Sequence, residues 1–133
     1  MLGHHVAQAA VTTYDSFDRH NGAPFGLRKV ACSLLMLVHA NGLLTPKRLD
    51  QALALSTRNL TMLLDRLQDR DLIRRDRSPT DGRSQHIALT GTGKQLAGAS
   101  AAAAAPMEAE LTGRLSRAER LRLIELLRKV AGR

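Results

Sequence analysis

The stretch from residue 56 to residue 62 is rich in side chains that can recognise the edges of base pairs. In the major groove of duplex DNA, Arg matches guanine, Asn matches adenine, and Ser and Thr bond to bases or phosphates. If a helix begins at this stretch, its free N–H groups can also hold a phosphate. The simpler alternative is a solvent-exposed helix face that Ser56 merely caps. The candidate groups are Ser56, Thr57, Arg58, Asn59, Thr61 and Met62.

Arginines recur in the segment that follows. Arg74, Arg75 and Arg77 precede the turn-rich residues 78–82, and Arg83 comes directly after them. A guanidinium group is hydrated weakly enough to enter a narrow minor groove, where the negative potential of DNA is concentrated. The placement of these arginines on one predicted hairpin is therefore stronger evidence for DNA binding than the net charge of the region.

The whole chain is strongly basic, which favours a polyanionic partner. Its 133 residues contain 20 Lys and Arg against 12 Asp and Glu, a formal net charge of +8. A basic surface gains free energy when it releases the counterions condensed on phosphate. Aromatic residues make up only 2% of the chain, which disfavours single-stranded partners that stack on rings. No apolar run is long enough for a membrane span, and we expect no membrane partner.

The sequence contains little that indicates catalysis or metal binding. It has no Gly-rich phosphate loop and no activated Ser or Cys motif, so we expect neither an enzyme nor a cofactor. The single cysteine, Cys32, allows no internal disulfide and favours the cytoplasm. None of the five histidines has tight ligand spacing with Cys32, so we expect no metal. Redox sensing by Cys32 and metal sensing by the histidines remain minor alternatives.

Helical periodicity organises the N-terminal part of the chain. Apolar residues recur at helical spacing over residues 5–19 and 25–40, and an Asn-Gly pair follows each stretch. Asn and Gly both tolerate a positive φ and commonly end helices. The sequence therefore predicts two helices, the first ending at Asn21-Gly22.

A closely spaced helix pair is predicted next. Thr45 can cap a helix whose first residue is Pro46, and this short helix should run to about Leu53. Ser56 can cap a second helix, running to about Asp71. Two helices separated by so few residues, the first of them short, form a helix-turn-helix.

The remaining segments predict a hairpin and two further helices. Residues 72–77 and 85–89 flank the turn-rich tip and read as short strands. From Thr90 the chain is helical again, and we expect Pro106 to kink or break that helix. A capping box that begins at Ser116 should open a final helix with an apolar stripe.

The hairpin carries a specific motif. The pattern is Asp81-x-Arg83, then Leu89-Thr90-x-x-Gly93. With it, the chain resembles the MarR family (multiple antibiotic resistance regulators), whose members carry this pattern at the wing of a winged helix-turn-helix. Agreement extends upstream through residues 60–67 and 71–75 and covers about residues 25–93.

The resemblance implies roles and also shows departures. Arg83 matches the family's wing arginine, which enters the minor groove, and Asp81 matches the acid that orients it. The chain departs from the family at Asp71, where members usually have a glycine, and at Pro106. Its N-terminal part is also short.

These observations lead to one expected architecture. We expect a mainly α fold with a small β-hairpin wing, a winged helix-turn-helix over about residues 25–90, within a single domain that spans residues 1–133. Dimerisation helices should occupy about residues 1–24 and 91–133. The expected DNA-binding residues are Thr45, Lys47, Ser56, Thr57, Arg58, Asn59, Thr61, Met62, Arg66, Arg75, Arg77, Asp81 and Arg83.

The expected function is regulation of transcription by a homodimer that binds a pseudo-palindromic operator in double-stranded DNA, with repression favoured over activation. A small-molecule effector is left open, in a zone near Tyr14, Phe17, Met36 and His39. Two alternatives remain: a winged helix that binds proteins, and an architectural DNA binder without sequence preference.

Overall fold

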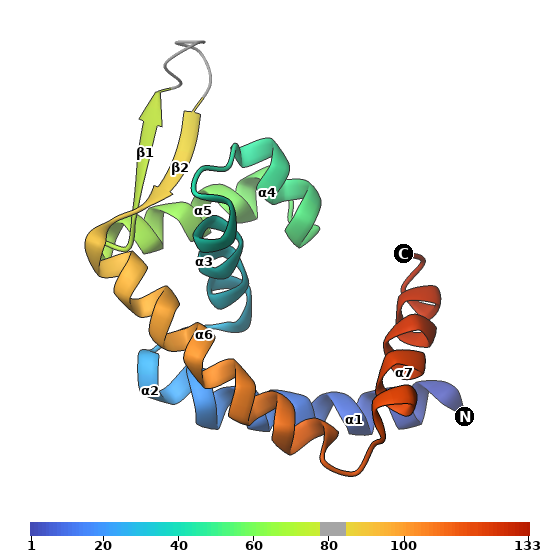
Figure 1. The fold of residues 1–133 in the computed structure, drawn as a ribbon. Helices are drawn as coiled ribbons and strands as arrows, with labels where there is room; N and C mark the ends of the chain where they lie inside the picture. Colours follow the sequence, from blue (N-terminus) through green and yellow to red (C-terminus); the bar gives the residue numbers. More distant parts are fainter. Residues whose placement is uncertain (78–84) are drawn as a thin grey trace.

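The fold is built around helix α3 (Lys29–Asn41), which lies at the centre of the computed structural model (Figure 1). The structure describes residues 1–77 and 85–133. Helix α3 is apolar on several sides, as expected of a helix that is buried among others. It packs against helix α6 (Gly91–Thr112) and strand β2 (Gln85–Leu89). Its buried residues are Ala31, Cys32, Leu34, Leu35 and Val38.

Two helices joined by a tight turn follow α3. Helix α4 (Pro46–Leu53) begins at the Thr45 cap, whose hydroxyl accepts from the Arg48 N–H at 3.3 Å. Helix α5 (Thr57–Asp69) begins at Ser56, whose hydroxyl accepts from the Asn59 N–H at 3.2 Å. Both predicted caps are therefore confirmed, and the predicted helix pair forms.

The hairpin has two antiparallel strands. Strand β1 (Ile73–Arg77) pairs with β2 in a register that places Ile73 opposite Leu89. Leu44, ahead of α4, exchanges two backbone hydrogen bonds with Ile87, of 2.7 and 3.1 Å, which ties the hairpin to the helix-turn-helix. The predicted fold class, mainly α with a β-hairpin wing, is confirmed.

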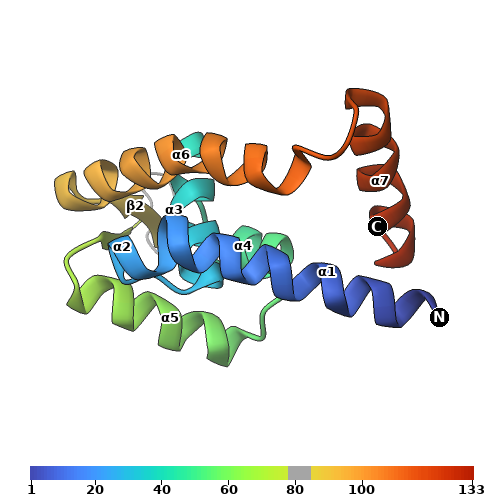
Figure 2. The same ribbon diagram turned by 90° about the horizontal axis from the view of Figure 1, so that it is seen from below.

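The terminal helices pack on this lobe in part and extend beyond it. Helix α1 (Leu2–Phe17) and the far half of α6 extend side by side away from it, and α7 (Arg117–Val130) lies near the N-terminal end of α1 (Figures 1 and 2). Helix α7 opens with the predicted capping box of Ser116 and Glu119. In the described parts of the chain, no single helix is long and apolar enough to cross a membrane. One bent pair, residues 2–25 with 29–41, meets that criterion by length and composition only, with an angle of 73° between them.

The helix stop expected at Asn21-Gly22 is wrong. The chain does not stop at Asn21-Gly22, because a π-helical turn, η1 (Asp18–Gly22), leads into α2 (Ala23–Phe25). The Asn21 side chain is buried and accepts a 2.5 Å hydrogen bond from Ser100 of α6, so it serves packing instead of a helix stop. The helical segment ends at Gly26, where φ is +61°.

Pro106, expected to kink or break its helix, lies inside α6 and does not break it. A proline removes one backbone donor from a helix. The residues immediately before it, 101–105, are all alanine, the residue with the highest helix propensity. Helix α6 therefore continues through Pro106 to Thr112.

Candidate nucleic-acid interface

The orientation of α5 is set by its apolar stripe. Leu60, Leu64 and Leu67 are buried in the core, and the other faces of the helix are left for solvent. The predicted groups Arg58, Asn59, Thr61, Met62 and Arg66 are all exposed. Met62 is 46% exposed, although a methionine on a helix ordinarily packs inward.

Four hydroxyl groups in α4, α5 and their caps take part in local hydrogen bonds. Thr45 and Ser56 accept from backbone N–H groups as caps. The Thr57 hydroxyl donates to a carboxylate oxygen of Asp50 at 3.5 Å, across the helix-turn-helix. Thr61 donates to the Thr57 carbonyl at 2.9 Å. Lys47, by contrast, is exposed in the first turn of α4.

The turn between α4 and α5 is conformationally strained. Ala54 has a φ of +53° and lies in the left-handed region. An L residue with a Cβ atom is disfavoured there by about 1 kcal/mol or more. This turn nevertheless sets the relative position of the two helices, because Leu55 follows at once and its N–H bonds to the Asp50 carbonyl at 3.3 Å.

Arg75 braces the hairpin against α5. Its Nε donates to Gln68 at 2.7 Å and its Nη2 donates to Asp65 at 2.6 Å. The side chain is only 24% exposed. Arg75 is one of the expected DNA contacts, and in the structure it links the first wing strand to α5. Its contact with DNA stays a prediction.

Of the other wing residues, the structure describes the two arginines of β1 but not Asp81 or Arg83. Arg77 is exposed at the end of β1. Arg74, on the same strand, forms an ion pair with Asp76 at 2.8 Å. Asp81 and Arg83 lie outside the described residues, so their roles rest on the sequence motif.

The base of the wing explains the second half of that motif. The Thr90 hydroxyl caps α6 by accepting from the Gly93 N–H at 3.0 Å, and it donates to the Asp71 carbonyl at 2.5 Å. The Leu72 carbonyl accepts from the Thr90 N–H at 3.1 Å. A Cβ atom at Gly93 would lie 1.9 Å from that same carbonyl oxygen. Only glycine therefore fits at this junction.

Asp71 occupies the position at which the family pattern has a glycine. Its φ is +58°, in the left-handed region. Glycine is the residue best suited to this backbone, and Asp and Asn are among the few others that tolerate it. The departure from the pattern therefore keeps the wing entry intact.

Three of the four residues in the predicted effector zone come together. Tyr14, Phe17 and Met36 line a cavity of about 340 Å³ between α1, α3 and α6. Lys29 reaches into the same region, with its Nζ 3.0 Å from the centroid of the Tyr14 ring. His39 does not join them, since it lines a different cavity beside Arg74.

Cys32 also lines this cavity, and the residue is buried. Its Sγ lies 3.1 Å from the Ser100 hydroxyl. Because Ser100 donates its only hydroxyl proton to Asn21, the Cys32 thiol is the donor in this contact. Over residues 1–77 and 85–133, no three His, Cys, Asp or Glu side chains gather closely enough to hold a metal ion.

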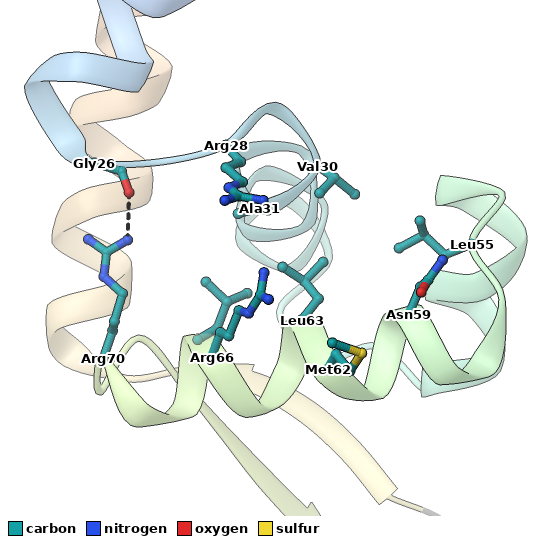
Figure 3. A pocket seen from close by; sticks show the side chains of 11 residues that line it. Gly26, Arg28, Val30, Ala31, Leu55, Asn59, Met62, Leu63, Arg66 and Arg70 are labelled. Carbon is teal, nitrogen blue, oxygen red and sulfur yellow. Dashed lines mark hydrogen bonds between the residues drawn. The ribbon is translucent and has the colours of Figure 1, made fainter.

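Two arginines that the sequence does not single out lie beside α5 in the structure. Arg70 donates to the carbonyls of Gly26, at 2.9 Å, and Phe25, at 3.1 Å. Arg28, just beyond, faces Arg66 of α5 across a cavity (Figure 3). Their alignment depends on contacts between residues more than 35 positions apart, which no local pattern reveals.

The outer surface of the terminal helices is unusually apolar. A groove of about 440 Å³ lies between α1 and α7, lined by residues such as Val6, Leu123 and Leu127. Leu121 is 54% exposed, and Ile124 and Val130 are exposed as well. So many exposed large apolar side chains on one helix are typical of protein interfaces.

Comparisons with known proteins all point to transcription regulators. The model of the MarR family matches residues 25–84. A putative transcriptional regulatory protein for the hcr operon of Thauera aromatica is 27% identical over 129 residues, covering 97% of this chain and 78% of the relative.

Solved structures extend the likeness to the terminal helices. A probable transcriptional regulator from Pseudomonas aeruginosa is 25% identical with a TM-score of 0.86, covering 98% of this chain and 96% of that one. The transcriptional repressor CouR, bound to a 23-mer DNA duplex, is 30% identical with a TM-score of 0.88, covering 98% of this chain and 92% of that one.

Proposed function

The chain belongs to the MarR family of transcription regulators, and from that premise we propose that it is a homodimeric repressor that releases a pseudo-palindromic operator when a small molecule binds. The family and the similar proteins are transcription regulators, not enzymes. CouR is described as a repressor and was solved on DNA, which supports repression as the mode of action.

The observation that carries the proposal is the exposed first half of α5. Arg58 and Asn59 stand in its first turn without a side-chain partner among the described residues, next to exposed Thr61 and Met62. These are the groups that recognise base edges when a helix enters the major groove. The remaining predicted contacts are proposed alongside them: Thr45, Lys47, Ser56, Thr57, Arg66, Arg75, Arg77, Asp81 and Arg83.

The dimer is proposed because one chain leaves its terminal helices only half covered. Residues 1–24 and 91–133 would form the dimerisation region and residues 25–90 the DNA-binding lobe. Pairing of two chains through α1 and α7 would bury the exposed leucines of α7 isologously. It would also bring two recognition helices to the spacing of two half-sites.

The cavity beside Tyr14, Phe17 and Met36 is the proposed effector site. It lies between the long helices and the DNA-binding lobe, so an occupant could alter the angle between them. Since operators are chromosomal, the same proposal places the protein in the cytoplasm.

Selection of binding sites from random duplex DNA tests the proposal. We expect a pseudo-palindromic consensus, bound with a steep salt dependence. Enrichment without any consensus would favour an architectural binder. Absence of salt-dependent binding to any duplex would favour a protein-binding winged helix, and either result would overturn the proposed function.

A further inference from the structure

A cavity of about 480 Å³ lies where the end of α3, the base of the hairpin and the start of α6 meet. Figure 1 shows the start of α6 at the base of the hairpin. No residue of α4 or α5 lines this cavity, and none of its lining residues is shared with the cavity beside Tyr14. The proposed DNA-binding surface and the proposed effector site therefore leave it unused.

The alternation of side chains along β1 sets the direction in which the cavity faces. Arg75 points to α5, where it bonds to Gln68 and Asp65. Successive side chains of a strand point to opposite faces, so Arg74 points away from the recognition helix. Arg74 lies opposite Ala88 in the ladder, and both line the cavity. A partner bound here would therefore not cover the face of α5 that is proposed to enter the major groove.

Three basic side chains reach this cavity from three separate elements. They are His39 of α3, Arg74 of β1 and Lys94 of α6, and all three are exposed. Arg74 is bonded to Asp76 through its Nε at 2.8 Å, so its terminal nitrogens can still donate to a partner. Within residues 1–77 and 85–133, Lys94 forms no ion pair, and no carboxylate lines the cavity. The cavity is therefore positive.

An exposed apolar side chain lies beside these charges. Leu43 lines the cavity and is 50% exposed, although the next residue, Leu44, is buried in the core. An inorganic anion would leave Leu43 in water, and a neutral apolar group would leave the basic side chains without partners. Basic groups from three elements also suit more than one carboxylate. A protein segment with acidic and aliphatic side chains supplies both kinds of contact along one chain.

We propose that this cavity is a docking surface for an acidic segment of another protein, in which Asp or Glu residues alternate with leucine-like ones. The carboxylates would accept charge-assisted hydrogen bonds from Arg74 and Lys94, and an aliphatic side chain would cover Leu43. Because the surface faces away from α5, the partner would bind while the regulator stays on its operator. Only this simultaneous binding rests on the proposed function.

Fluorescence anisotropy of a labelled hexapeptide of alternating aspartate and leucine, titrated with the full chain, tests the surface. A peptide with asparagine in place of aspartate removes only the charge, and acetate as a competitor supplies a carboxylate without the chain. We expect the acidic peptide to bind about tenfold or more tightly than the asparagine peptide, and acetate not to displace it at millimolar concentration. Absence of binding, equal binding of the two peptides, or displacement by acetate would overturn the proposal.

Exposed side chains of the cavity can be changed without disturbing the core. Lys94→Gln should weaken binding of the acidic peptide about tenfold, and Lys94→Arg should restore it, since the charge is what the peptide needs. Leu43→Ser should also weaken binding, because the aliphatic contact is lost. Lys129→Gln, which removes an exposed lysine of α7, is the control and should bind as wild type does. Equal losses in Lys94→Gln and Lys129→Gln would show unspecific attraction to a basic chain and overturn the site.

Addition of the selected duplex separates this surface from the DNA-binding one. At physiological ionic strength, charges more than about 8 Å apart are largely screened, so a saturating duplex should leave the affinity for the peptide largely unchanged. Displacement of the peptide by the duplex would assign the peptide to the DNA-binding surface and overturn the inference.

The two proposals fail in distinguishable ways. Peptide binding that depends on Lys94, in a chain that binds no duplex, would retain the docking surface and overturn the proposed function. Specific duplex binding by a chain that does not prefer the acidic peptide would overturn the inference and leave the proposed function standing.

Discussion

Arg58 is the residue whose contact with DNA would carry the most sequence information. It is exposed in the first turn of α5 and has no side-chain partner in the described part of the chain. Thr57 and Ser56, its neighbours, are already bonded within the protein. The structure thus separates a free guanidinium group from two hydroxyls that position the helix.

Arg58→Ala should weaken binding to the selected operator by about 1–3 kcal/mol and relax the base preference at one position. The measurement is a set of equilibrium affinities for the operator and its single-base variants. Arg114→Ala, distant from α5, is the control and should keep both affinity and preference. A uniform loss across all variants would make Arg58 a phosphate contact instead.

At the junction between the wing and α6, Gly93 leaves no room for a Cβ atom. Gly93→Ala places a Cβ atom on the backbone carbonyl of Leu72, where no flexible side chain can give way. We expect the free energy of unfolding to fall by about 3 kcal/mol or more. Thermal or urea unfolding measures the change.

Gly98 provides the matched control on the same helix. A Cβ atom at Gly98 would meet nothing within 4 Å. Gly98→Ala should raise stability by about 0.5–1 kcal/mol, because alanine is the better helix former. Similar effects of the two substitutions would contradict the explanation of the Leu-Thr-x-x-Gly motif.

At the scale of elements, the connection between α4 and α5 stores strain that a substitution can release. Ala54→Gly removes the Cβ atom from a residue with a φ of +53°. We expect a net gain of about 0.5–1 kcal/mol in the free energy of unfolding, after the greater chain entropy of glycine is subtracted. Chemical denaturation gives the value.

Ala52→Gly, inside α4, is the control for this prediction. It should lower stability by about 0.5–1 kcal/mol, because glycine is unfavourable within a helix. Asp71→Gly should also stabilise, but by less, since Asp tolerates the left-handed region better than Ala does. A loss of stability in Ala54→Gly would show that the turn is not strained.

An ion pair and a hydrogen bond join α6 to the segment formed by α1 and η1. Glu110 of α6 forms an ion pair with Arg19 of η1 and accepts a 3.1 Å hydrogen bond from Ser16. The hydrogen bond from Arg19, followed by that from Ser16, lowers the pKa of Glu110 below its ordinary 4.5. The same ion pair raises the pKa of Arg19.

A lowered pKa in the folded state stabilises the protein above the unfolded pKa, and this contribution is lost as pH falls through the folded value. Thermal melts from pH 7 to pH 3 should therefore show a larger fall for wild type than for Glu110→Gln, which has no charge to lose. Glu108→Gln, two residues away on α6, should follow wild type. If wild type and Glu110→Gln lost stability equally as pH falls, the Glu110 ion pair would make no contribution to the pH dependence of stability.

At the scale of the whole molecule, the proposed dimer depends on the exposed apolar side chains of α7. Replacing Leu121, Ile124 and Leu127 together with Asp should yield a monomer of about 14.5 kDa in sedimentation, because charges cannot be buried in an apolar interface. Tight operator binding should be lost with the dimer.

Two charge changes on the polar side of α7 serve as the control. Arg122→Asp with Lys129→Asp breaks exposed ion pairs with Glu125, which contribute little to stability. This variant should stay dimeric. If the wild-type chain sedimented as a monomer at high concentration, the proposal of a dimer that binds two half-sites would be wrong.

Local sequence patterns were sufficient to predict the helices and strands that make up the candidate interface. Thr45, Ser56 and Ser116 cap helices as predicted, because a cap needs only a side chain and an N–H group three residues away. The strand β2 and the turn into α6 also follow from neighbouring residues. The fold class was therefore evident from the sequence.

Only the tertiary structure decided what distant side chains do. Asn21 was expected to end a helix and instead bonds to Ser100. Arg75 bonds to Gln68 of α5, a role that the sequence did not indicate, and its contact with DNA stays a prediction. Gly93 and Arg70 owe their roles to backbone carbonyls far along the chain. The capping and periodicity of a segment depend on its own residues, whereas the partner of a long polar side chain depends on which other segment packs against it.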